Sequence, residues 1–129
     1  MRVLIVEDAP DFAQIVEMLV VRCGHDVKTV PTGEAALSYA QHVRPELVLV
    51  DLGLPGMDGY ELASRLRNDV GLVNSKIMAL SGYAPDQRRN EAAGIDGHLM
   101  KPLKLSVLKS LLVGQCDMKS YSAAAPRNS

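Results

Sequence analysis

The chain has 129 residues, of which 47% are hydrophobic and 22% are charged, and its formal net charge is −1 at pH 7. This length fits one domain that can bury a core without disulfides or a structural metal, and the composition excludes wholesale disorder. The charge gives no overall electrostatic case for wrapping a nucleic acid or lying on an anionic membrane. The apolar run at 3–6 is too short for a secretory or membrane-spanning segment, so we expect a cytoplasmic protein.

The first half of the chain predicts two rounds of strand followed by helix. After the apolar strand at 3–6, a helix is expected whose apolar face consists of Phe12, Ile15, Val16, Leu19 and Cys23. Gly24 can end this helix. A weaker strand is expected over 25–30, and Thr32 can cap a second helix that stops before Pro45.

The second half of the chain continues this alternation. Apolar runs at 47–50 and 77–80 predict two more strands, and such continuous runs are typical of strands buried on both faces. A helix is expected after Gly59, a shorter polar helix over 85–93, and a fifth strand over 97–100. The apolar face of a last helix is formed by Leu105, Leu108, Leu111 and Leu112.

Five alternating strands and helices imply a parallel sheet with helices on both faces. In such sheets, ligands bind beyond the carboxyl ends of the strands. The pattern fades near residue 115, which predicts a domain at 1–114 and a flexible C-terminal tail at 115–129. With the last helix assigned to the core, no helix-turn-helix candidate remains in the sequence, and we expect no direct nucleic-acid binding.

Polar residues stand where four of the predicted strands end. In chain order, they are Glu7, Asp8, Asp51, Ser81 and Lys101. Because the carboxyl ends of parallel strands share one edge, these side chains are expected to meet there. Three carboxylates repel one another and need a counter-charge. Oxygen ligands without His or Cys favour a hard ion, and the sequence therefore predicts a Mg²⁺ site.

Phosphoryl transfer is the chemistry that these residue types favour. An aspartate such as Asp51 can attack a phosphoryl group and form an acyl phosphate, while the metal and Lys101 neutralise the transferring oxygens. The Ser81 hydroxyl and the Gly82 amide can donate hydrogen bonds to that group.

Each of these residues also has an ordinary interpretation when it is taken alone. An acidic pair after a strand is often a solvated turn, and aspartate is common in Gly- and Pro-rich loops. Lys101 could be a surface cation and Ser81 a cap. Their joint placement favours the site. His25 and His42 lack a metal-binding context and are expected to face solvent.

Four short motifs resemble those of the receiver domains of bacterial two-component response regulators, over residues 1–113. They are Val6-Glu7-Asp8, Asp51-Leu52-Gly53-Leu54-Pro55-Gly56-Met57-Asp58-Gly59, Ala79-Leu80-Ser81-Gly82-Tyr83 and Met100-Lys101-Pro102. The resemblance implies a flavodoxin-like (βα)5 three-layer sandwich. Its five-stranded parallel sheet would have the order 2-1-3-4-5, with helices on both faces.

The resemblance also implies a role for individual residues. Glu7 and Asp8 would be the acidic pair, Asp51 the phosphoacceptor and Lys101 the phosphate-contacting base. The Gly53 carbonyl would be a further protein ligand of Mg²⁺, beside the carboxylates.

Two residues are assigned to the conformational switch. Ser81 would supply the switch hydroxyl. Three residues before the lysine, the family usually has Tyr or Phe as a rotating aromatic, and this chain departs from that pattern with His98. Pro102 would follow a cis peptide bond.

The implied function is a phosphorylation-dependent signalling switch in a two-component system or phosphorelay. A histidine kinase or phosphotransfer protein would phosphorylate Asp51. The surface of the fourth helix, fifth strand and fifth helix would then change its binding of a downstream protein or fused domain. Two phosphorylated copies of the chain could also bind each other and form a homodimer. The chain would catalyse only its own phosphorylation and dephosphorylation, and would not be an enzyme otherwise.

Three other functions are alternatives to a phosphorylated switch. An unphosphorylated pseudo-receiver would be a protein-binding or dimerisation module, and the complete set of site residues argues against it. An aspartyl phosphatase would need a second Asp where Gly53 stands. A flavin or nucleotide site would need a Gly-, Ser- or Thr-rich loop after the first strand, whereas the acidic segment 7–11 repels phosphate.

Overall fold

The computed structural model describes residues 1–113, and the predicted tail at 115–129 lies outside them. The strands are β1 (Arg2–Val6), β2 (Asp26–Val30), β3 (Leu47–Asp51), β4 (Lys76–Ser81) and β5 (Gly97–Met100). The helices are α1 (Pro10–Arg22), α2 (Gly33–His42), α3 (Gly59–Arg65), α4 (Gln87–Ala93) and α5 (Leu105–Val113). A π-helical turn, η1 (Leu66–Val70), continues α3. In the part of the chain that the structure describes, no helix is long and apolar enough to cross a bilayer.

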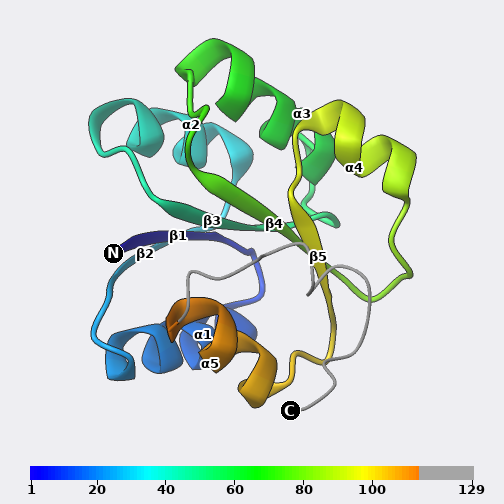
Figure 1. Ribbon diagram of the computed structural model, residues 1–129. Coiled ribbons are helices and arrows are strands. Elements are labelled where there is room, and N and C mark those ends of the chain that lie inside the picture. The colour runs from blue at the N-terminus through cyan, green and yellow to red at the C-terminus, as the bar shows by residue number, and fades with distance from the viewer. Residues whose placement is uncertain (114–129) are drawn as a thin grey trace.

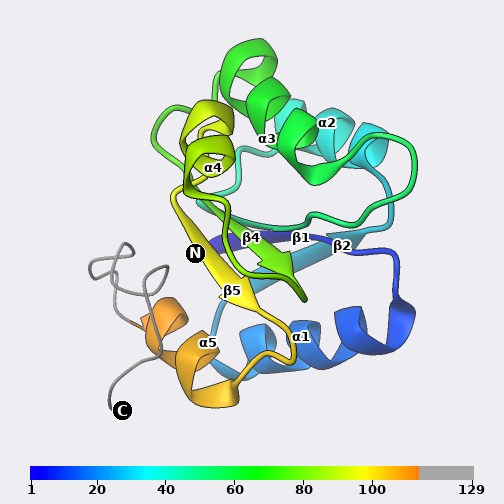
Figure 2. The same cartoon turned by 90° about the vertical axis from the view of Figure 1, so that its right-hand side faces the viewer.

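The five strands form one parallel sheet in the order β2-β1-β3-β4-β5, which confirms the predicted fold. Figures 1 and 2 show α2, α3 and α4 on one face of this sheet and α1 and α5 on the other. The central strands are apolar except at their ends, because their inner residues contribute side chains to both faces. In β1, Leu4 packs in the core on the α2, α3 and α4 side, whereas Ile5 packs on the α1 and α5 side.

Local signals in the sequence explain where most helices begin and end. The Thr32 hydroxyl accepts a hydrogen bond from the Ala35 amide at 3.1 Å and caps α2, as predicted. Gly94 ends α4 in the left-handed conformation with φ 82°. The polar helix predicted over 85–93 begins two residues later, at Gln87, because Asp86 is its N-cap.

The predicted apolar face of α1 is wrong at one position. Ile15 is 58% exposed, whereas the residues that α1 buries are Ala13, Val16 and Val20. Those three lie at i, i+3 and i+7 and define the line of contact with the sheet. One residue corresponds to about 100° around a helix, which turns Ile15 away from the sheet although Val16 is buried.

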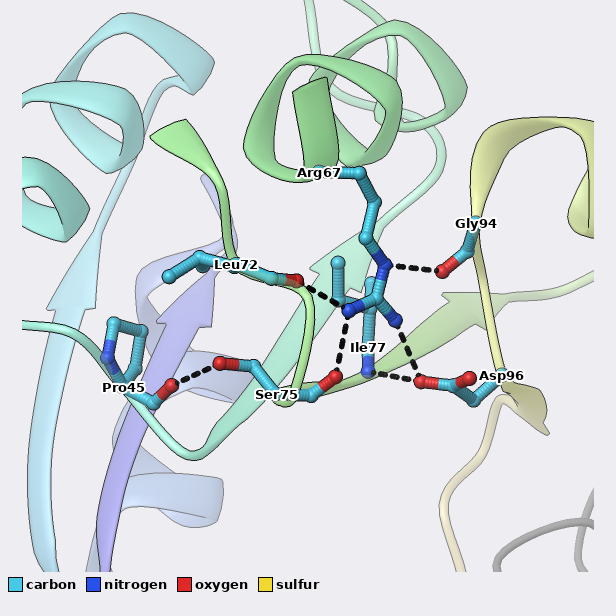
Figure 3. Close-up of polar contacts among 7 residues, drawn as sticks. All are labelled: Pro45, Arg67, Leu72, Ser75, Ile77, Gly94 and Asp96. Atoms are coloured by element: carbon cyan, nitrogen blue, oxygen red, sulfur yellow. Dashed lines mark hydrogen bonds and ion pairs between the residues drawn. The ribbon is translucent and has the colours of Figure 1, made fainter. Parts of the chain in front are cut away.

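A half-buried hydrogen-bond network at the amino end of the sheet joins η1 to the strands, and the sequence did not predict it. Figure 3 shows the guanidinium group of Arg67 at its centre. This group donates hydrogen bonds to the carbonyls of Gly94, Leu72 and Ser75 and forms an ion pair with Asp96 at 2.8 Å. A side chain on residue 94 would meet the stem of Arg67, since a Cβ there would lie 2.7 Å from its Cγ.

Asp96 and Ser75 extend this network to the amino ends of three strands. The same Asp96 oxygen that pairs with Arg67 accepts a hydrogen bond from the Ile77 amide at 2.9 Å. The Ser75 hydroxyl donates to the Pro45 carbonyl at 2.6 Å. The network therefore links the segments just before β3, β4 and β5 and holds the end of α4 close to the end of α3 (Figure 3).

Replacing Arg67 by Met should lower the free energy of unfolding by about 3 kcal/mol, because the carboxylate of Asp96 and three carbonyls lose a charged donor. Urea unfolding followed by circular dichroism measures this loss. The matched control is Arg65→Met, which breaks an exposed ion pair with Glu61 and should cost less than about 0.5 kcal/mol. Equal losses in the two variants would contradict a structural role for the network.

Candidate functional site

The site lies at the edge of the sheet where the strands end. Glu7 and Asp8 directly follow β1, Asp51 is the last residue of β3, and Ser81 is the last residue of β4. Lys101 directly follows β5. Parallel pairing in register brings these strand ends to one edge, since Val6 is paired with Val50 and Ser81 with Met100.

Glu7, Asp8 and Asp51 form the carboxylate cluster of this edge. One carboxylate oxygen from each lies within 4.8 Å of the others. Glu7 and Asp51 are buried, whereas Asp8 is exposed. Three oxygen donors at this spacing, two of them withdrawn from water, fit a hard divalent cation that neutralises their charge.

Lys101 lies against the carboxylate cluster and supplies a positive charge from the chain itself. Its Nζ is 3.0 Å from Oε1 of Glu7 and 3.6 Å from Oδ2 of Asp51. The peptide bond between Lys101 and Pro102 is cis, as the resemblance implied. Four predicted site residues, Glu7, Asp8, Asp51 and Lys101, therefore lie together in the structure.

Glu7 has the most perturbed environment of the cluster. Burial raises its pKa above the ordinary value of 4.5, and the hydrogen bonds from Lys101 and from the Ala9 amide oppose that rise. The neighbouring Asp51 raises the pKa of Glu7 further. A second cation near Glu7 would favour its ionised form, so this cluster could hold a metal ion.

The loop after β3 holds Asp51 in place. The Gly53 amide donates a hydrogen bond to Oδ1 of Asp51 at 3.0 Å. Asp58 caps α3 by accepting a hydrogen bond from the Glu61 amide at 2.8 Å, so it serves the turn as expected. Gly59 packs against the backbone here, because a Cβ would lie 2.9 Å from the Asp51 carbonyl oxygen. The role of the Gly53 carbonyl as a metal ligand stays a prediction.

Comparison with known proteins identifies the family. The family model of the response regulator receiver domain matches residues 3–113. This chain belongs to that family. The receiver domain is 34% identical over 103 residues to the DNA-binding response regulator MtrA of Mycolicibacterium smegmatis, over 80% of this chain and 45% of that protein. It is 35% identical to the gliding motility regulatory protein of Myxococcus xanthus, over 78% of this chain and 13% of that protein.

The receiver domain is also similar to solved structures. Chemotaxis protein CheY4 of Vibrio cholerae superposes with a TM-score of 0.80 at 28% identity, over 85% of this chain and 94% of that chain. By contrast, this chain spans less than half the length of the two curated relatives. The family therefore places the receiver domain in two-component signal transduction.

Ser81 and His98, the two predicted switch residues of the receiver domain, meet at the backbone of Tyr83. The Ser81 hydroxyl accepts a hydrogen bond from the Tyr83 amide at 2.9 Å. Nε2 of His98 donates to the Tyr83 carbonyl at 3.1 Å. The side chain of Tyr83 itself is 82% exposed. The sequence did not predict this link, because it runs through main-chain atoms of a loop.

His98 is buried, with 3% of its surface exposed, and within the described residues its Nδ1 has no hydrogen-bond partner. Burial lowers the pKa of His98 below the ordinary value of 6.5, and the hydrogen bond to Tyr83 only partly offsets this effect. The imidazole is therefore neutral at physiological pH and carries its proton on Nε2.

The expectation that both remaining histidines face solvent is wrong for His25. Its Nε2 donates to the Leu112 carbonyl of α5 at 3.0 Å, and its Nδ1 lies 2.9 Å from the nitrogen of Met1. His25 is half-buried between these segments, whereas His42 is exposed as expected. The contact joins residues 87 positions apart, and a pattern of neighbouring residues does not predict it.

Burial of His98 predicts a pH-dependent stability. A depressed histidine pKa means that protonation favours the unfolded chain, so the free energy of unfolding should fall as the pH drops below 6.5. His98→Phe should remove this part of the pH dependence, and replacing the exposed His42 by Gln should retain it. Urea unfolding at a series of pH values tests this, and parallel profiles for wild type and His98→Phe would contradict the assignment.

Proposed function

We propose that this receiver domain is a phosphorylation-dependent switch in which Asp51 accepts a phosphoryl group from a histidine kinase or phosphotransfer protein. The observation that carries the proposal is the position of Lys101, whose ammonium group reaches both Glu7 and Asp51. A lysine in this place neutralises charge on transferring phosphoryl oxygens. A pseudo-receiver that only binds proteins has no need of this arrangement.

Mg²⁺ is the cofactor that the carboxylate cluster fits, and it would supply positive charge beside the transferred group. Both oxygens of Glu7 already accept hydrogen bonds, Oε1 from Lys101 and Oε2 from the Ala9 amide. Asp8 is exposed and lies next to Asp51 in the cluster. We therefore assign Asp8 and Asp51 as direct ligands, with Gly53 through its carbonyl, and Glu7 as the group that completes the acidic site.

The chemical step is a displacement at phosphorus. An oxygen of the Asp51 carboxylate attacks the phosphorus atom of the phosphoryl group that the donor carries. The bond between phosphorus and the donor breaks, the donor leaves with the electron pair, and an acyl phosphate forms on Asp51. The hydrogen bond from the Gly53 amide to Oδ1 orients the carboxylate. Lys101, 3.6 Å from Oδ2, faces the charge that develops on the phosphoryl oxygens. The same site would later admit water for dephosphorylation, and no other catalysed reaction is proposed.

Ser81 connects this chemistry to the surface. A phosphoryl oxygen on Asp51 would accept a hydrogen bond from the Ser81 hydroxyl, and the turn of this side chain toward Asp51 would break the bond that it accepts from the Tyr83 amide. Release of that amide shifts the loop that leads into α4, and the hydrogen bond from His98 to the Tyr83 carbonyl transmits the shift to β5. The result is a change in population between two conformers.

The face formed by α4, β5 and α5 is the proposed output surface. Tyr83 and Met100 are large hydrophobic side chains that are exposed beside it. A downstream protein, a fused domain or a second phosphorylated copy would bind there. The relative MtrA is a DNA-binding response regulator, and this chain spans 45% of it. We propose that any contact with DNA is made by a different domain or partner.

Incubation with acetyl phosphate and Mg²⁺ should add one phosphoryl group to the wild-type chain, and intact-mass spectrometry detects it. The adduct should be stable in acid and labile in base, as an acyl phosphate is. Asp51→Asn should lose the adduct because the nucleophile is gone. Asp58→Asn is the matched control, since it keeps the same loop and a capping side chain. An unmodified wild-type mass would instead favour the pseudo-receiver.

A further inference from the structure

Phe12 belongs to the apolar face of α1 and also lies beside the site. It lies in the first turn of α1 and packs half-buried against the core on the α1 and α5 side. The Nζ of Lys101 lies over its ring, 4.7 Å from the centroid. This distance is within the range in which the negative face of an aromatic ring attracts a cation. It is also the only phenylalanine of the chain.

Among the described residues, the other partners of the Lys101 ammonium group are two of the three carboxylates of the cluster. Glu7 lies 3.0 Å away and Asp51 3.6 Å away. A divalent cation in that cluster would compete with the lysine for the same oxygens and repel it. A flexible lysine stem with weakened ion pairs can swing into water. The ring of Phe12 is an uncharged partner that a bound cation does not compete for.

We infer that Phe12 is a positioning residue: its ring face holds the Lys101 ammonium beside Asp51 while a cation occupies the carboxylate cluster. The inference rests on the proposed phosphorylation of Asp51. The side chain of Lys101 is 28% exposed, so the strength of its contact with the ring should lie between that of a fully solvated cation–π pair and that of a desolvated one. Loss of the ring face should therefore slow phosphorylation by about threefold to tenfold.

The rate constant for phosphorylation of Asp51 by acetyl phosphate at saturating Mg²⁺ distinguishes an effect of the aromatic ring face from an effect of apolar packing. Phe12→Leu keeps an apolar side chain without a π face, and this variant should be phosphorylated more slowly than wild type. Phe12→Tyr keeps the face and should restore the rate. In a Lys101→Met background, Phe12→Leu should cause no additional loss, since the cation is absent. Rates of Phe12→Leu equal to wild type, or equal losses with and without Lys101, would overturn the inference.

Tyr60→Leu is the matched control. The guanidinium group of Arg89 lies 3.8 Å from the centroid of the Tyr60 ring, so this variant removes another aromatic face from beneath a cation. The pair joins α3 to α4, away from Lys101, and its loss should leave the rate unchanged. A slow Tyr60→Leu variant would show that removing any such ring disturbs the fold, and would count against a specific role of Phe12.

A second readout does not depend on activity. Because the chain has one phenylalanine, incorporation of 4-fluorophenylalanine gives a single ¹⁹F resonance at position 12. In saturating Mg²⁺, Lys101→Met should move this resonance, whereas Lys109→Met, a change at an exposed position of α5, should not. A resonance that Lys101→Met leaves in place would overturn the inference even if Phe12→Leu fails to fold.

The two proposals fail in different ways. If wild type gains no phosphoryl group, the proposed function is wrong and the positioning role falls with it. If wild type is phosphorylated on Asp51 but neither the rate nor the ¹⁹F resonance responds as described, the proposed function stands and only the role of Phe12 is wrong.

Discussion

Three carboxylates lie together at one edge of the sheet, and Lys101, which follows β5, contacts two of them. Glu7, Asp8 and Asp51 bring carboxylate oxygens within 4.8 Å of one another, and two of these residues are buried. Such an arrangement costs free energy unless a cation is present. Lys101 supplies part of the compensation through contacts with Glu7 and Asp51. The remaining excess of negative charge is what makes the site receptive to a divalent ion.

The two ends of the sheet have different properties. At the amino ends of the strands, Arg67 and Asp96 fix the end of α4 at Gly94 through half-buried hydrogen bonds (Figure 3). At the carboxyl ends, the chain that leads into α4 is held through the backbone of Tyr83. The Tyr83 amide donates a hydrogen bond to the Ser81 hydroxyl, and the Tyr83 carbonyl accepts one from His98. A helix anchored strongly at one end responds to changes at the other end. Under the proposed function, this geometry would carry a change at Asp51 to the surface near α4.

The strands, and the meeting of the polar residues at their carboxyl ends, were predictable from the sequence because apolar runs and parallel topology determine both. Asp51 directly follows an apolar strand, and the parallel topology then determines which other strand ends lie near it. Contacts between distant segments were not predictable in this way. Arg67 and Asp96 are 29 positions apart, and each is an ordinary charged residue in a polar segment. Ile15 matched a helical apolar face, yet the close packing of smaller neighbours against the sheet leaves it exposed.

If the site works as proposed, one cation binds between Asp8 and Asp51, and a crystal grown with Mn²⁺ in place of Mg²⁺ would reveal it. Manganese accepts the same oxygen ligands and scatters X-rays anomalously. We predict a single strong anomalous peak within the carboxylate cluster, coordinated by Asp8 and Asp51, with Lys101 still beside Asp51. A cluster without anomalous density at saturating Mn²⁺, or a peak elsewhere on the molecule, would contradict this account of the site.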